Sequence, residues 1–559
     1  MEYILIAIVM ILFLFIIALK GYLDYRKELK IFSQKLFTEY GILPPKEYKP
    51  EQFSRIQGYF KKHQDSFFID DITWNDLNMD EVFKKLNYSY SAAGEEYLYY
   101  LLRTPIFDDA LLQRREDIIS YFRNDNKTRA AYQLLFYKMG GCGKFSIYDY
   151  LDYLDNLGER SNLKHYISLI AVFISAIILF INLPIGLLIM VLVFVYNILR
   201  YFKIKNEIDP YLTSFGYIFK LLNTVTELEK IPIPLLQEEW KELKICSRSL
   251  NGFKRGSYLL MSSGQMSGSG NPIEILLDYL RMVFHLDLIQ FNRMLKEVRN
   301  HIADIDRMLS IVGMTEAMIA IGAFREGNPD NCIPEFISKP QLKAVNLYHP
   351  LLETPIKNNF ETNKSILITG SNASGKSTFL KTVALNQILA QTIHTCLADL
   401  YQTFFFRVIS SMSLRDDIQE GDSYYMVEIK ALKRIMDEIT KEEAPVLCFV
   451  DEVLRGTNTV ERIAASVQIL QSLSSQNCLC FAATHDIELT HLLEHIYANY
   501  HFEEEIENND IFFSYKIMNG RARTRNAIKL LGIMGYDKSI IEDAEKMANL
   551  FLSTGSWQG

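Results

Sequence analysis

A stretch rich in glycine and serine carries the groups that hold the phosphates of a nucleotide. Residues 370–377 read Gly-Ser-Asn-Ala-Ser-Gly-Lys-Ser, which matches the spacing G-x-x-x-x-G-K-[ST]. Glycines in such a loop let backbone N–H groups turn toward phosphate oxygens, and the N-terminus of the following helix favours anions. We expect Lys376 to reach the β- and γ-phosphates and Ser377 to bind Mg²⁺. The spacing predicts ATP and Mg²⁺ as cofactors; the alternative is a surface turn rich in glycine and serine.

Two later segments add an acidic pair and a histidine. Asp451 and Glu452 follow the apolar run 445–450, and His485 follows the run 478–484. We expect Asp451 to hold the metal ion through water and Glu452 to act as general base on the attacking water. His485 is expected to sense the γ-phosphate. Acids and histidines often follow strands, but in this order and spacing they predict hydrolysis of ATP.

Strands and helices of an α/β domain must position these side chains. The run Ser-Ile-Leu-Ile-Thr at 365–369 precedes the loop, and a helix-like stretch begins at Ser377. Residues 445–450 form a short apolar run of the kind found in buried parallel strands. The fold class predicted for this part of the chain is an α/β P-loop ATPase domain.

The composition limits the number of folding units, the case for binding nucleic acid and the state of the cysteines. The chain has 559 residues, of which 49% are hydrophobic and 23% charged, so most of it is expected to fold, in roughly three or four units. Its formal net charge of −8 gives no overall electrostatic case for binding nucleic acid, so any DNA contact would need a local basic face. The seven cysteines show no C-x-x-C spacing, which predicts free thiols in a reducing cytosol.

Three apolar runs predict membrane-spanning helices. Residues 3–19 form an unbroken apolar run without a cleavage site, which predicts a signal anchor. Residues 166–201 are almost wholly apolar and are interrupted near Asn182, Pro184 and Gly186, which predicts two spans joined by a short turn. The alternative is a buried pair of soluble helices. The flanking positive charges are Lys20, Arg26, Lys27, Lys30, Arg160, Lys164, Arg200, Lys203 and Lys205. They predict a multi-pass protein of the cell membrane with the ATPase on the cytoplasmic side.

The chain therefore divides into five predicted regions. A transmembrane anchor at 1–20 precedes a cytoplasmic helical region at 21–164, and a transmembrane hairpin occupies 165–201. Residues 202–339 continue as helices around a flexible Gly/Ser loop at 262–272, and residues 340–559 form the ATPase domain.

Four motifs in the last region resemble the ATPase of the MutS family, a branch of the ABC-type ATPases. Residues 369–378 resemble that family's G-x-N-x-x-G-K-S-T loop, and residues 451–459 resemble its D-E-x-x-R-G-T-x-T segment. Residues 483–485 resemble its A-T-H, and residues 416–428 resemble its signature segment. More weakly, the helical stretch that begins at residue 87 is similar to the start of that family's helical core.

The resemblance implies a head-to-tail homodimer formed through the ATPase domains. Ser423 would contact the γ-phosphate held by the opposite subunit, and residues 455–459 would couple the two sites. The alternative for Ser423 is a cap of the helix that follows. The residues expected to contact the nucleotide are Gly370, Ser371, Asn372, Ala373, Ser374, Gly375, Lys376, Ser377, Thr378 and, across the dimer, Ser423. Catalysis would rest on Lys376, Glu452 and His485, and the metal ligands would be Ser377 and Asp451.

Two functions remain open at this point. The first is a membrane-anchored ATPase that binds DNA, mismatched or structured, as the resemblance implies. The second is a membrane ATPase that acts on a protein partner without DNA. The Phe-x-Glu triplets at 37–39, 324–326 and 502–504 are taken as chance, so a mismatch-reading domain is not expected. Small-molecule transport is not expected, because the spans offer few polar residues. The basic residues at 241–255 and 521–525 are read as solvated faces or turns.

Overall fold

The computed structural model describes the chain in two compact units. The described residues are 2–64, 67–254, 280–371, 374–412, 424–441, 443–454, 458–474, 477–507, 510–522, 528, 531 and 535–554. The helical unit comprises Met1–Gln64, Leu86–Leu101 and Arg115–Gly327. The sheet unit comprises Asp65–Lys85, Leu102–Arg114 and Asn328–Gly559. The architecture is thus mostly helical, with mixed α/β structure in the second unit.

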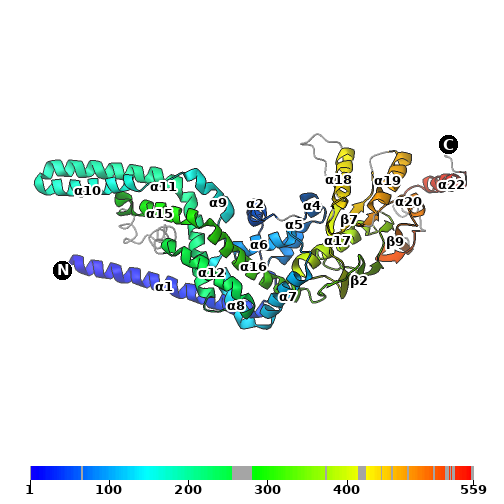
Figure 1. Cartoon of the computed structure of the whole chain (residues 1–559), viewed down its shortest axis with the longest axis horizontal. Helices are drawn as coiled ribbons and strands as arrows, with labels where there is room; N and C mark the ends of the chain where they lie inside the picture. Colours follow the sequence, from blue (N-terminus) through cyan, green and yellow to red (C-terminus); the bar gives the residue numbers. More distant parts are fainter. Residues whose placement is uncertain are drawn as a thin grey trace. The chain divides into compact units, whose positions relative to one another are not determined.

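Helices follow one another from residue 2 to residue 327. In chain order they are α1 (Glu2–Thr38), α2 (Pro50–Ile56), α3 (Gly58–Lys62), α4 (Asp71–Asp76), α5 (Met79–Leu86), α6 (Ala92–Arg103), α7 (Asp109–Asn124), α8 (Asn126–Met139), α9 (Ile147–Tyr153), α10 (Leu163–Ile181), α11 (Leu183–Leu228), α12 (Gln237–Ser249), α15 (Leu286–Asn300) and α16 (Ile302–Gly327) (Figure 1). Two short 3₁₀ turns occupy Leu154–Leu157 and Pro234–Leu236.

Helices α10 and α11 form an antiparallel pair joined at Asn182 (Figure 1). The Asn182 side chain caps α11 by accepting a hydrogen bond from the Ile185 N–H at 3.3 Å, and Pro184 occupies the first turn, where its missing N–H costs nothing. Gly186 lets the helices approach closely, because a Cβ there would lie 2.4 Å from Leu179 Cα. The turn residues of the sequence therefore build a tight helical hairpin.

Among the residues that the structure describes, three helical stretches are long and apolar enough to cross a membrane, and they differ in how much of each is buried. Residues 163–181 and 183–209 have a mean hydropathy of 2.1 each, and only 22% and 11% of their apolar windows are buried. Residues 302–327 reach 1.4, but 89% of that window is buried inside the protein. Helix α16 is therefore the core of the helical unit, whereas α10 and the first part of α11 expose their apolar side chains.

Helix α16 carries buried ionisable side chains that have hydrogen-bond partners within the helical unit. The Arg325 guanidinium donates to both carboxylate oxygens of Glu116 at 2.7 Å, and the Arg325 side chain is 1% exposed. Glu316 accepts hydrogen bonds from the backbone N–H of Tyr90, at 2.5 Å, and of Ser91, at 3.0 Å. A buried charge is tolerated only with such partners, so these contacts fix the position of α16.

The sheet unit contains two β-sheets. Its strands are β1 (Glu335–Phe336), β2 (Leu342–Leu347), β3 (Asn358–Thr362), β4 (Ile366–Thr369), β5 (Leu400–Thr403), β6 (Arg407–Ser411), β7 (Val446–Asp451), β8 (Cys478–Ala483), β9 (Ala498–Glu507) and β10 (Asp510–Asn519). Its later helices are α17 (Lys376–Ile393), α18 (Tyr424–Ile439), α19 (Thr459–Leu473), α20 (Ile487–Leu492) and α22 (Lys538–Thr554) (Figure 1). The smaller sheet has the order β1-β5-β2-β3.

The larger sheet has the order β10-β9-β4-β8-β7-β6 and is parallel except for β10. Parallel strands buried on both faces read as continuous apolar runs, which is the pattern of β4, β7 and β8. Helices α18 and α19 cover one face through Leu432, Ile435 and Leu470, beside Cys448 and Cys480 of the strands. The other face carries Phe481, which meets Phe360, and Phe360 in turn meets Phe379 of α17.

Two helical stretches from early in the chain belong to the sheet unit. Asp76 of α4 accepts hydrogen bonds from Ser410 Oγ at 2.6 Å and from the Met412 N–H at 2.9 Å, at the end of β6. The Ile106 N–H donates to the Gln391 carbonyl oxygen of α17 at 2.8 Å. Residues 65–85 and 102–114 thus secure the edge and one helix of the larger sheet.

Candidate nucleotide-binding site

Two glycines shape the loop between β4 and α17. Gly370 has φ +147° and Gly375 has φ +101°, backbone conformations that side chains other than glycine rarely adopt. A Cβ on Gly370 would lie 2.7 Å from Ser374 Oγ and 2.9 Å from the Phe502 carbonyl oxygen. Gly375 caps α17, whose first residue is Lys376. The strand, loop and helix expected at 365–385 are therefore present, and both glycines are required by the backbone.

Lys376 lies folded back over this loop. Its Nζ donates to the carbonyl oxygens of Gly370 and Ser371 at 2.8 Å each, and it lies 3.4 Å from His485 Nε2. Lys376 is only 3% exposed. A lysine ammonium held at the centre of a glycine loop is placed to meet phosphate oxygens.

The hydroxyl side chains of the loop are held by local hydrogen bonds. Ser374 Oγ donates to the Ser371 carbonyl oxygen at 2.8 Å, and Ser371 Oγ donates to the Glu504 carboxylate of β9. Ser377 is half-buried and Thr378 is exposed in the first turn of α17. The predicted contacts Asn372 and Ala373 lie outside the described residues.

Asp451, Glu452 and His485 lie at the carboxyl ends of β7 and β8. Asp451 pairs with Ala483 in the parallel register, and the Glu452 N–H donates to the Ala483 carbonyl oxygen at 2.9 Å. Glu452 Oε1 lies 2.8 Å from His485 Nε2. Since His485 also approaches Lys376, the lysine, the histidine and the glutamate form one continuous set of contacts. The structure therefore brings together the three predicted catalytic residues, and it places Asp451 beside Glu452.

The backbone around Glu452 is unusual. Glu452 has φ +60° and Leu454 has φ +57°, values that are uncommon for residues other than glycine and that cluster at functional sites. The Leu454 N–H donates to Glu428 Oε1 of α18, and Glu428 is 1% exposed. Glu428 is the last residue of the predicted signature segment, so this contact ties that segment to the turn that presents Glu452.

Asp486 fixes the segment after His485. Arg462 of α19 donates to both Asp486 oxygens, at 3.0 Å from Nε and 2.6 Å from Nη2. Hydrogen bonding to Asp486 raises the pKa of Arg462. The Asp486 N–H in turn donates to Thr484 Oγ1 at 3.0 Å. Sequence reasoning missed this pair, because nothing in the spacing of Arg462 and Asp486 sets it apart from ordinary surface charges.

A pocket of about 310 Å³ opens beside the loop, next to Gly375 and Thr378. The side chains that shape it include His349, Leu352, Ile356, Phe379, Phe502 and Tyr515. Burial lowers the pKa of His349 to about 4, so this histidine is neutral at physiological pH, and its Nδ1 accepts a hydrogen bond from the Leu351 N–H at 3.2 Å. A pocket with aromatic side chains next to a phosphate-binding loop has the size and chemistry for a nucleobase.

Several residues that the sequence predicted to be functional lie outside the described part of the structure. Ser423 and the segment Arg455–Thr457 are among them, as are Arg255, Arg523 and Arg525 of the two basic clusters. Among the described members of those clusters, Lys241 pairs with Glu238 at 2.8 Å, and Arg521 pairs with Glu494. These two cations therefore have acidic neighbours, as expected for solvated faces.

Comparison with known proteins assigns the sheet unit's later part to a family. The family described as MutS domain V matches residues 366–551, which include the loop, Asp451, Glu452 and His485. The human "MutS protein homolog 4" is 30% identical over 288 residues, which are 48% of this chain and 30% of the relative. The "DNA mismatch repair protein MutS" of Pseudothermotoga lettingae is 32% identical over 229 residues, 39% of this chain and 28% of the relative.

A third relative gives the same picture. The "DNA mismatch repair protein MutS" of Lactobacillus acidophilus is 30% identical over 281 residues, 48% of this chain and 32% of the relative. The match thus spans about a third of the length of each of these curated relatives. The loop, the acidic pair and the histidine all lie inside the matched residues, and this part of the chain belongs to the family described as MutS domain V.

Proposed function

We propose that this protein is an ATPase of the P-loop, ABC type that is anchored in the cell membrane and binds and hydrolyses ATP with Mg²⁺. The observation that supports this most strongly is the meeting of Lys376, His485 and Glu452 at one edge of a parallel sheet, within contacts of 3.4 and 2.8 Å. The match of residues 366–551 to MutS domain V supports it further. The residues that serve this function are those that the sequence predicted.

The groups around the loop have different roles in ATP hydrolysis. Lys376 would exchange the carbonyl oxygens of Gly370 and Ser371 for phosphate oxygens, and Ser377 and Asp451 would hold Mg²⁺. The metal ion, when bound, neutralises charge on the phosphates. Glu452 orients the attacking water and accepts its proton, while His485, whose Nε2 contacts the Glu452 carboxylate, senses the γ-phosphate. The pocket beside Gly375 takes the nucleobase of ATP.

A homodimer completes the site in this proposal. In the proposed arrangement Ser423 of each subunit contacts the γ-phosphate bound to the other. The buried contact between Glu428 and the Leu454 N–H supports such coupling, because it joins the signature segment to the turn of Glu452 within one subunit. ATP binding closes the dimer and hydrolysis reopens it.

The exposed hairpin supports the membrane topology that we propose. Helices α10 and α11 present apolar side chains such as Phe173, Ile177 and Leu192 to their surroundings, which a bilayer would cover. The proposed regions are the anchor at 1–20, the hairpin at 165–201, helical regions at 21–164 and 202–339, and the ATPase domain at 340–559 on the cytoplasmic side. The hairpin serves as an anchor, and we propose no transport of small molecules.

We propose DNA, mismatched or structured, as the macromolecule that this ATPase handles. The names of two relatives, both DNA mismatch repair proteins, support this choice. The alternative is a membrane ATPase that acts on a protein partner, which the net charge of −8 and the acidic neighbours of Lys241 and Arg521 favour.

Two measurements on full-length protein in detergent test these proposals. The first is the rate of ATP hydrolysis in the wild type and in Lys376→Ala and Glu452→Gln; unchanged rates in both variants would refute the assigned site. The second is the effect of duplex, mismatched and branched DNA on the wild-type rate, together with DNA binding at increasing salt. DNA binding that weakens steeply with salt supports phosphate contacts. Indifference to every DNA at low salt, with intact basal hydrolysis, would leave the protein-partner alternative.

A further inference from the structure

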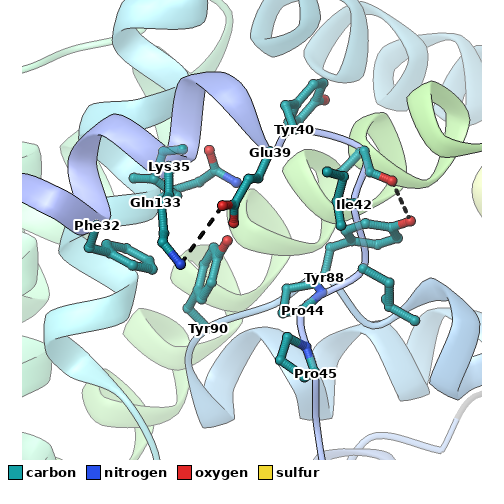
Figure 2. Close-up of a pocket in the computed structure, with 14 residues that line it drawn as sticks. Phe32, Lys35, Glu39, Tyr40, Ile42, Pro44, Pro45, Tyr88, Tyr90 and Gln133 are labelled. Carbon is teal, nitrogen blue, oxygen red and sulfur yellow. Dashed lines mark hydrogen bonds and ion pairs between the residues drawn. The ribbon is translucent and has the colours of Figure 1, made fainter.

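A second pocket, of about 200 Å³, lies in the helical unit far along the sequence from the ATPase residues (Figure 2). The end of α1 and the turn at residues 39–45 form one side of it. Tyr88 and Tyr90, from the segment before α6, Gln133 of α8 and Ala323 of α16 form the rest. Segments from four parts of the chain therefore enclose a space large enough for several water molecules, or for one small ligand.

One ion pair lies at this pocket. Lys35 Nζ is 3.8 Å from Oε1 of Glu39, the residue just after the end of α1, and their side chains are 56% and 49% exposed. Figure 2 shows the two side chains pointing toward one another beside Tyr90. An exposed pair at this distance contributes little to stability. A positive and a negative charge are thus available together to a ligand.

Gln133 of α8 is a buried polar residue among those that line the pocket. It is 4% exposed, and its Oε1 has no hydrogen-bond partner among the described residues. A buried amide oxygen without a donor is unfavourable, and native structures rarely keep one without a reason. A ligand that donates a hydrogen bond to Gln133 Oε1 would remove this cost.

The remaining walls are aromatic and apolar, and they are held in place by the protein itself. The ring of Phe32 stacks on Tyr137 at 3.8 Å and meets Tyr90 edge-on at 5.3 Å. Tyr88 donates its hydroxyl hydrogen to the Gly41 carbonyl oxygen at 3.1 Å, and Gly41 adopts φ +88°. The pocket is therefore formed before any ligand arrives, which lowers the entropic cost of binding.

We propose that this pocket binds a free α-amino acid with an apolar or aromatic side chain. A zwitterion complements both charges at once: its carboxylate pairs with Lys35, and its ammonium pairs with Glu39 and donates to Gln133 Oε1. Its side chain packs among Leu36, Ile42 and Tyr88. A ligand with a single charge could pair with Lys35 or with Glu39, but not with both.

The position along α1 favours a water-soluble ligand over a lipid. The proposed anchor ends near residue 20, and fifteen helical residues separate it from Lys35, about 22 Å at ~1.5 Å per residue. The pocket would therefore lie in the cytosol, beyond the reach of an acyl chain in the bilayer.

Calorimetry and thermal unfolding of full-length protein in detergent, with each of the common amino acids, test the proposal. We expect at least one apolar or aromatic amino acid to bind with a dissociation constant on the order of 1 mM or lower and to raise the unfolding temperature. For L-phenylalanine the matched probes are phenethylamine and 3-phenylpropionate, which each lack one charge and should bind about tenfold more weakly or worse. Binding by no amino acid, or equal binding of the charge-deleted probes, would overturn the proposal.

Substitutions of the lining residues test whether the amino acid binds in this pocket. Gln133→Leu, Lys35→Gln and Glu39→Gln should each weaken binding about tenfold or more, because each removes one hydrogen bond to a charged group. Lys30→Gln, on the same helix but outside the pocket, is the matched control and should bind as the wild type does. Lys376→Ala should also bind normally, which separates this pocket from the nucleotide site. Unfolding without ligand checks that each variant is folded, and unchanged binding by folded Gln133→Leu would refute the assignment.

Discussion

Glu452 and His485 follow two different strands, yet their side chains meet with 2.8 Å between Oε1 and Nε2. The parallel register of β7 and β8 brings them together, because it pairs Asp451 with Ala483 and so ends both strands at the same level. The positive φ of Glu452, +60°, then turns its side chain out of the strand path. Register and one uncommon backbone angle thus create a contact between residues that lie far apart in the sequence.

The first prediction concerns Glu452 as the general base. Glu452→Gln should bind ATP but hydrolyse it on the order of 10²- to 10⁴-fold more slowly, because an amide cannot accept the proton of the attacking water. Single-turnover hydrolysis together with equilibrium binding of a fluorescent ATP analogue separates the two effects. Glu461→Gln, an exposed acid in the first turn of α19, is the matched control and should behave as the wild type does. Normal turnover in Glu452→Gln would show that another group acts as the base.

The second prediction concerns the loop lysine. Lys376→Ala should lose nucleotide binding or turnover, because it removes the ammonium that lies between the Gly370 and Ser371 carbonyl oxygens and His485. Lys364→Ala removes an exposed lysine just before β4 and should leave binding unchanged. Titration with the same analogue reports both variants, and tight binding by Lys376→Ala would contradict the assigned role.

A third prediction uses two glycines with similar backbone angles. Gly375 has φ +101° and Gly520 has φ +96°, so alanine at either position should cost about 1–2 kcal/mol of backbone strain. A Cβ on Gly375 would also lie 3.0 Å from Tyr515 Cδ1, whereas nothing lies within 4 Å of one on Gly520. We expect both variants to lose stability in denaturant titrations, but only Gly375→Ala to lose ATP binding. Equal binding by the two would mean that Gly375 is needed only for folding.

A fourth prediction concerns pH. Burial raises the pKa of Glu96 from 4.5 to about 8, even though its Oε2 accepts hydrogen bonds from the Tyr59 N–H at 3.2 Å and Ser146 Oγ at 2.8 Å. The folded protein therefore holds a proton on Glu96 that the unfolded chain releases above pH 4.5. The free energy of unfolding should fall, on the order of a few kcal/mol, as pH rises from 4.5 through about 8.

Glu96→Gln should remove this part of the pH dependence, because the amide stays neutral throughout. Denaturant unfolding of the helical unit, followed across the pH range, compares the two proteins. Glu51→Gln, at an exposed acid, should keep the wild-type slope. An identical slope in wild type and Glu96→Gln would place the sensitive proton elsewhere.

Local pattern was enough to predict the elements around the site. The runs at 365–369, 445–450 and 478–484 correspond to β4, β7 and β8, because strands buried on both faces have to be apolar throughout. The glycine spacing likewise predicted the loop, since only glycine takes the backbone angles of Gly370 and Gly375 without strain.

Features that depend on distant packing were beyond the sequence. Phe502 and Tyr515 complete the pocket beside Gly375 only because β9 lies next to β4 in the sheet and β10 lies next to β9, and no local motif sets these two aromatic residues apart. The same holds for Asp76. Its place in the sequence does not distinguish it from other acidic residues of helices, and only the structure shows that it accepts hydrogen bonds at the end of β6. Helix α16 is apolar enough to suggest a span, and only its 89% burial shows that it is a core helix.

The buried thiols of the larger sheet have a practical consequence. Cys448 lies in the strand that ends at Asp451, is 0% exposed, and has its Sγ 3.6 Å from Cys478 Sγ; burial raises the pKa of its thiol well above the usual range. An alkylating reagent can therefore reach Cys448 only when β7 separates from its neighbours. The rate at which Cys448 is alkylated in the native protein therefore reports how often the strand that leads to the acidic pair opens. A bound nucleotide should lower this rate.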